Sequence, residues 1–95
     1  MQYHFDDFSG CLNQTFTLEF DDASTYPLKL ISVDKHPDRA TSSEHEAFSI
    51  VFRGANPGLE QQIYHIKHDT LGAMELFIVP IGPDDEGMCY EAVFA

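Results

Sequence analysis

The sequence predicts an all-β fold: one small antiparallel β-barrel or sandwich of about six strands, with space for one short N-terminal helix. Short runs of aromatic and β-branched residues recur along the chain, and turn-forming residues separate them. No helical period extends over a long segment. The chain has 95 residues, of which 43% are hydrophobic and eight are Phe, and this suffices for one core in a single domain over residues 1–95.

The individual elements follow from the spacing of apolar and turn residues. Phe5 and Phe8 lie at helical spacing, whereas the following segment alternates strictly between apolar and polar side chains, as in a half-buried strand. In the next strand the apolar set changes face, which predicts a β-bulge or bend near Leu30. In chain order we expect a helix or packed arm over residues 3–13 and strands over residues 15–20, 27–34, 47–53, 62–68, 73–81 and 88–94.

The strand over residues 73–81 differs from the others, because it is apolar on both faces except at Glu75. One face belongs to the core. The sequence leaves two alternatives open for the other face: burial under the N-terminal segment, or exposure as a contact surface for a partner. The residues on this outer face are Phe77, Val79 and Ile81.

The charge balance excludes several classes of partner. Acidic side chains number 16 and basic ones 5, giving a formal net charge of −11. Binding to nucleic acid or to an anionic membrane needs clustered Lys and Arg, so we expect no direct nucleic-acid contact and no membrane contact. No signal-peptide pattern is present, and no apolar run approaches the ~20 residues that span a bilayer, so a cytoplasmic protein or a part of a larger particle is expected.

Two cysteines, Cys11 and Cys89, lie near opposite ends of the chain and can pair only if the terminal segments are neighbours. Small secreted scaffolds normally carry more cysteines, which favours two buried thiols in a reducing compartment. Cys89 falls inside a predicted strand, where we expect a buried thiol and not a nucleophile of low pKa.

Residue types that bind metals or catalyse reactions are present, but their spacing does not fit either role. His65 and His68 are three residues apart in a strand, so they point to opposite faces and cannot share an ion. Asp34, His36 and Asp38 lie in the polar loop 34–46 beside basic residues, which favours solvated charge over a cation site. No nucleophile motif is recognised, and the sequence predicts a protein that is not an enzyme and needs no cofactor or metal.

Two charged features stand out by position. Arg53 ends an apolar strand, and we expect it to pair with a carboxylate across the sheet, Glu91 or Glu75. The turn over residues 82–87 carries three consecutive carboxylates, whose simplest role is solvated surface charge. They are Asp84, Asp85 and Glu86.

Several sequence blocks resemble a small bacterial domain family of unknown function. They are F-S-I-V-F-R-G at 48–54, L-x-Q-x-x-Y at 59–64, H-D-T-L-G at 68–72, L-F-I-V-P-I-G at 76–82 and Y-E-A-V-F at 90–94, and residues 10–18 match the opening of the family. The resemblance implies an assembly, accessory or interaction role beside phage-tail-like or fibre proteins. It carries no catalytic residue over to this chain.

Three functions remain open. The leading one is a non-enzymatic protein-interaction or assembly module, an accessory of a phage-tail-like or fibre structure, which binds another protein or copies of itself through an apolar face or strand edge. The alternatives are an acidic nucleic-acid mimic that inhibits a basic protein, and a small-molecule-binding β-barrel. The interface candidates are Phe77, Val79, Ile81, Arg53, Asp84, Asp85 and Glu86.

Overall fold

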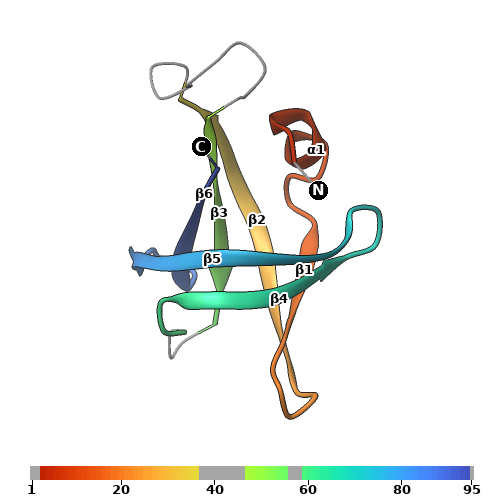
Figure 1. Cartoon of the computed structure of the whole chain (residues 1–95). Helices are drawn as coiled ribbons and strands as arrows, with labels where there is room; N and C mark the ends of the chain where they lie inside the picture. Colours follow the sequence, from red (N-terminus) through yellow and green to blue (C-terminus); the bar gives the residue numbers. More distant parts are fainter. Residues whose placement is uncertain (1–2, 37–46, 56–58, 95) are drawn as a thin grey trace.

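The computed structural model describes residues 3–36, 47–55 and 59–94, which form a closed antiparallel barrel and one short helix (Figure 1). The elements are α1 (Phe5–Ser9), β1 (Thr15–Glu19), β2 (Thr25–Lys35), β3 (Phe48–Gly54), β4 (Gln62–His68), β5 (Gly72–Pro83) and β6 (Met88–Phe94). The strand order around the barrel is β1-β2-β3-β6-β5-β4. The predicted antiparallel all-β fold is confirmed, and the barrel is the form it takes.

Two long strands, β2 and β5, change neighbours partway along their length. β2 pairs first with β1 and then with β3, and β5 pairs with β4 through residues 72–78 and with β6 through residues 79–83. In Figure 1 β4 and β5 run roughly horizontally, whereas β3 and β6 run roughly from top to bottom. A short ladder between β1 and β4, centred on Leu18 and Ile66, closes the ring.

The bulge predicted near Leu30 is confirmed, because the β2–β3 register shifts between Leu30 and Ser32. A second irregularity, not predicted from the sequence, lies in β5 between Pro80 and Gly82. Gly82 has a φ of 113°, a backbone conformation that residues with a Cβ atom rarely adopt. β5 also continues to Pro83, so the acidic turn is shorter than predicted.

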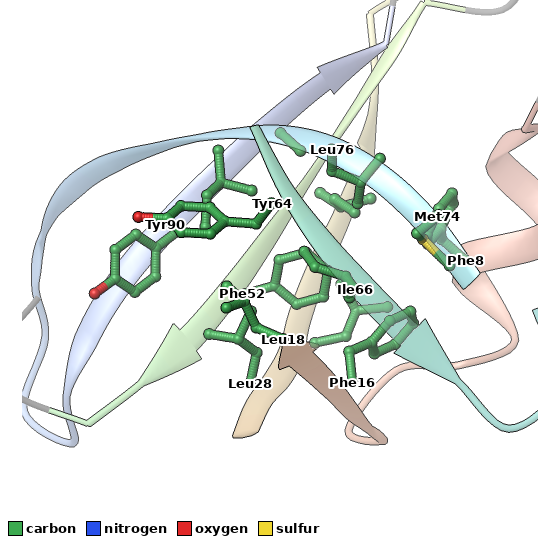
Figure 2. Close-up of a cluster of buried hydrophobic side chains, with 14 of the residues drawn as sticks. Phe8, Phe16, Leu18, Leu28, Phe52, Tyr64, Ile66, Met74, Leu76 and Tyr90 are labelled. Carbon is green, nitrogen blue, oxygen red and sulfur yellow. The ribbon is translucent and has the colours of Figure 1, made fainter. Parts of the chain in front are cut away.

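Side chains from all six strands fill the interior of the barrel (Figure 2). Buried and exposed positions alternate along β4 as predicted, with Tyr64, Ile66 and His68 inside. The largest fully buried side chains are Tyr90, Phe8, Phe16, Phe48, Phe52, Leu18, Leu28, Leu30, Ile50, Ile66 and Ile78. The interior is therefore a packed core, as is usual for barrels of this size.

The helix α1 contributes one side chain to this core. Phe8 is fully buried, and its ring centroid lies 6.2 Å from that of Phe16, 5.9 Å from Phe48 and 5.3 Å from Phe94. The amino-terminal segment thus packs against β1, β3 and β6. It leaves the outer side of Phe77 in β5 half exposed.

Within the described parts of the chain, no helix is both long and apolar enough to cross a membrane. The predicted polar loop lies mostly in residues 37–46 and the predicted turn after β3 includes residues 56–58, and both segments are outside the described residues.

Candidate functional site

Exposed apolar side chains gather on the outer surface of β4, β5 and β6. Ile63 is 63% exposed, Phe77 50% and Val93 52%, and Val79 is partly buried. Ile63 and Phe77 are directly opposite each other in the β4–β5 ladder, so their side chains share one face. We call Ile63, Phe77, Val79 and Val93 the outer apolar patch.

A groove of about 410 Å³ lies between β5 and β6 and runs into this patch. Residues 75–77 and Val79 line it from β5, and residues 91–94 line it from β6. Leu76 and Ala92 are buried side chains of the barrel core, so they form its floor, whereas Phe77 and Val93 face outward. We call this feature the β5–β6 groove.

The ionisable residues that line the β5–β6 groove are both carboxylates. Glu75 lies opposite His65 in the β4–β5 ladder, and its Oε1 atom is 3.6 Å from His65 Nδ1. Glu91 lies opposite Val51 on β3 and Val79 on β5. The groove therefore combines an apolar floor with acidic groups on its rim.

The other end of the β5–β6 pair is held by a charged cluster, which we call the hairpin clamp: Arg53, Asp84 and Glu86. Arg53 Nε donates to Asp84 Oδ2 at 2.8 Å, its Nη2 also pairs with that oxygen, and its Nη1 lies 3.0 Å from Glu86 Oε2. The second oxygen of Asp84 accepts hydrogen bonds from the backbone N–H groups of Glu86 and Gly87 at 2.8 and 3.0 Å. These contacts order the turn.

The expected partners of Arg53, Glu91 or Glu75, were wrong. β3 pairs with β6 so that Arg53 lies opposite Cys89, which brings the turn before β6 within reach of the guanidinium. The hydrogen bond from Arg53, followed by those from the turn backbone, lowers the pKa of Asp84 from 3.8 to about 2. Asp84 is therefore held in its charged form by geometry that requires the folded hairpin.

Two glycines allow close packing at the end of β3: Gly87 lets the turn before β6 approach the backbone of β3, and Gly54 leaves space for a side chain of β2. A Cβ atom at Gly87 would collide with the backbone carbonyl oxygen of Gly54. A Cβ atom at Gly54 would collide with the ring of Tyr26, whose hydroxyl donates to the carbonyl of Ala55. Burial, followed by the interaction with the Tyr90 hydroxyl, raises the pKa of Tyr26 to about 12.

The remaining candidates have structural surroundings. Cys11 and Cys89 are free thiols, and the prediction that Cys89 is buried is confirmed; burial raises the pKa of both thiols. His65 is exposed and His68 buried, so the prediction of opposite faces is confirmed. His68 Nδ1 accepts from the backbone N–H groups of Thr70 and Leu71, and its Nε2 lies 2.6 Å from Gln14 Oε1.

Asp34 and His36 do not form a joint site in the described residues. Asp34 accepts a hydrogen bond from Ser32, while His36 Nε2 lies 2.8 Å from Ser49 Oγ. Asp38 is outside the described residues. Across residues 3–36, 47–55 and 59–94, no three His, Cys, Asp or Glu residues are grouped as metal ligands.

The structure thus divides the predicted interface candidates between two places. Phe77 and Val79 line the groove, whereas Arg53, Asp84 and Glu86 form the hairpin clamp, with Asp85 exposed beside it. Ile81 is 52% exposed and lies in the β5 bulge between the two places. Ile63 and Val93 were not predicted as interface residues from the sequence. The available signal was an apolar residue on the outward face of an alternating strand.

The fold and surface define the class: a small six-stranded antiparallel barrel with a packed interior and an apolar outer groove. The chain belongs to a family described only as a domain of unknown function, DUF6916, whose family model matches residues 3–94. The predicted resemblance to an uncharacterised domain family is thereby confirmed. No curated protein and no solved structure matches the chain.

Proposed function

We propose that this domain is a non-enzymatic protein-interaction module that binds another protein through the outer apolar patch. The observation that carries the proposal is the adjacency of Ile63 and Phe77, two large apolar side chains that are at least half exposed and directly opposite in the ladder. Single exposed apolar residues are common on proteins, whereas contiguous ones usually mark an interaction site. Burial would contribute roughly 25 cal/mol for each Å² removed from water.

A second protein fits this patch better than a second copy of the chain. Each copy carries a net charge of −11, and two copies would repel each other at short range. A partner with a neutral or basic surface meets no such repulsion. The finer role, as an accessory of a phage-tail-like or fibre assembly, rests on the sequence resemblance.

The two alternative functions have less support. Two of the three carboxylates in the acidic turn, Asp84 and Glu86, are already paired with Arg53, so they are poorly placed to imitate free phosphates. A small-molecule site within the barrel would need interior space, and aromatic and aliphatic side chains occupy that interior (Figure 2).

The proposal is tested with a double variant, Ile63→Ser with Phe77→Ser. Tagged wild-type protein is purified from cells of its source, the captured protein is identified by mass spectrometry, and the pair is recombined from purified components. We expect the double variant to lose at least about tenfold in affinity, because it removes two large apolar side chains from the proposed contact and a few residues carry most of the binding energy of an interface.

The matched control is Leu12→Ser, which removes another exposed apolar side chain from the connection between α1 and β1. Leu12 is 42% exposed, and we expect its substitution to leave the affinity unchanged. Equal binding by the wild type and the double variant, with both proteins folded by circular dichroism, would contradict the proposed function.

A further inference from the structure

The β5–β6 groove exists because two neighbouring strands separate. Their ladder runs from the Pro83–Met88 pair to the Val79–Glu91 pair, and within the described residues it extends no further. Beyond that point β5 continues to pair with β4 through residues 72–78, and β6 continues to pair with β3 through residues 92–94. Each strand therefore keeps one neighbour and turns its other edge toward the groove.

The free edge of β5 offers main-chain hydrogen-bonding groups. In an antiparallel ladder, successive residues direct their N–H and C=O groups to opposite sides of the strand. Among residues 75–78, every second residue therefore directs both groups toward the groove. Strand edges of this kind are natural sites for pairing with another chain.

The side chains around this edge suit an extended segment. A strand laid along β5 would point alternate side chains toward the floor formed by Leu76 and Ala92, which is apolar. Its remaining side chains would point outward beside Phe77 and Val93, at the level of the rim carboxylates Glu75 and Glu91. An apolar residue thus fits the inward positions, and Lys or Arg fits the outward ones.

We infer that the β5–β6 groove binds an extended segment of another protein as an added β-strand, and that this segment alternates apolar and basic residues. The inference rests on the proposed function and specifies the chemistry of its partner and the mode of binding. Charge complementarity selects the occupant: both ionisable lining residues are acidic, and a second copy of this chain would add further negative charge.

The probe is an acetylated and amidated peptide, Lys-Val-Lys-Ile-Lys-Val-Lys, titrated into isotope-labelled protein and followed by NMR. We expect saturable shifts at residues 75–79 and 91–94. Amide exchange should slow at alternate residues within 75–78, because only these face the added strand. A peptide with Glu in place of Lys should not bind.

Two backbone-methylated forms of the peptide test the pairing itself. One carries N-methyl groups on the Val and Ile residues, and the other carries them on internal Lys residues. Alternation fixes which side chains point inward, so one methylated form loses the N–H groups that face β5 and the other loses those that face away. We expect at least about tenfold weaker binding for one form only. Unchanged binding by both forms would overturn strand addition.

Charge is tested with Glu75→Gln combined with Glu91→Gln. This variant should bind the basic peptide several-fold more weakly and with less dependence on salt. The control, Asp21→Asn combined with Asp69→Asn, removes the same charge from exposed turns and should bind as the wild type does. Equal weakening by both pairs would overturn recognition at the groove and indicate a general effect of net charge.

Failure of this inference can be separated from failure of the proposed function. If the natural partner loses affinity for the double serine variant while neither the unmodified nor the methylated peptides bind, strand addition is overturned and the apolar interaction surface stands. If the partner binds the double serine variant with the same affinity as it binds the wild type, the proposed function itself is overturned.

Discussion

The two halves of the β5–β6 strand pair differ in what holds them. From Val79 to Met88 the strands are paired, and the hairpin clamp, with Gly87 packed on Gly54, fixes the turn. In the other half the strands diverge, and half-exposed apolar side chains border the gap. The ion pairs of Arg53 hold the paired half, whereas the other half combines exposed apolar side chains with free main-chain edges. We call the paired half the closed half and the half in which the strands diverge the open half. The contrast favours the open half as the binding region.

The largest expected effect concerns the inner face of the open half. Ile78 adjoins Phe77 in β5 but is fully buried. We expect Ile78→Ala to lower the free energy of unfolding by about 2–5 kcal/mol, because it leaves a cavity in the core. Urea denaturation measures this change. A loss below about 1 kcal/mol would mean that the open half is loosely packed inside as well as outside.

The next effect concerns the closed half. Gly87→Ala should cost about 1–3 kcal/mol, because its Cβ atom would meet the fixed backbone of Gly54 and not a movable side chain. Gly10→Ala is the matched control, since its Cβ atom would have Asp6 O at 3.8 Å as its nearest neighbour, an ordinary contact. Equal stability of the two variants by urea denaturation would show that the hairpin is not tightly packed.

Asp84→Asn tests the hairpin clamp through pH. The pKa of the Asp84 carboxyl group is about 2 in the folded protein, compared with 3.8 when the group is free of these contacts, as in the unfolded chain. The folded state therefore binds the proton less readily. Its stabilisation is thus fully present above the unfolded pKa and is lost as the pH falls through 3.8 toward 2. The melting temperatures of wild type and variant should differ near pH 7 and converge near pH 2.

The control for this experiment is Asp85→Asn. Asp85 is the neighbouring exposed carboxylate, and in the described structure it makes none of the contacts with Arg53. A gap between wild type and Asp84→Asn that does not narrow in acid would contradict the role of the clamp.

The smallest expected effect on stability is that of Phe77→Ser. It removes a half-exposed side chain, so its cost should stay below about 1 kcal/mol, mostly from the lost cross-strand contact with Ile63. Thermal melting measures it. A large loss of stability would mean that the outer patch serves folding and not binding, and would remove the contrast between the two halves.

Alternation and turn residues were sufficient to predict the strands, the inward faces and the bulge near Leu30. They did not predict which strands become neighbours, because local patterns carry no information on long-range pairing. The partner of Arg53 was predicted wrongly for this reason, because it depends on β3 lying beside β6. The groove was also beyond prediction, since it arises where two ladders end at different residues. Phe77 was found because its strand is apolar on both faces.

The short β1–β4 ladder, which joins Leu18 to Ile66 and closes the ring, has a consequence for the order of folding. Turns connect β1 to β2 and β4 to β5 to β6, so these pairs form between near neighbours in the chain. Ring closure and the β3–β6 pairing join distant segments and require costly loop closure, which places folding of such topologies at roughly milliseconds to seconds. We expect ring closure to be the slow step, during which the edges of β1 and β4 are open to other chains.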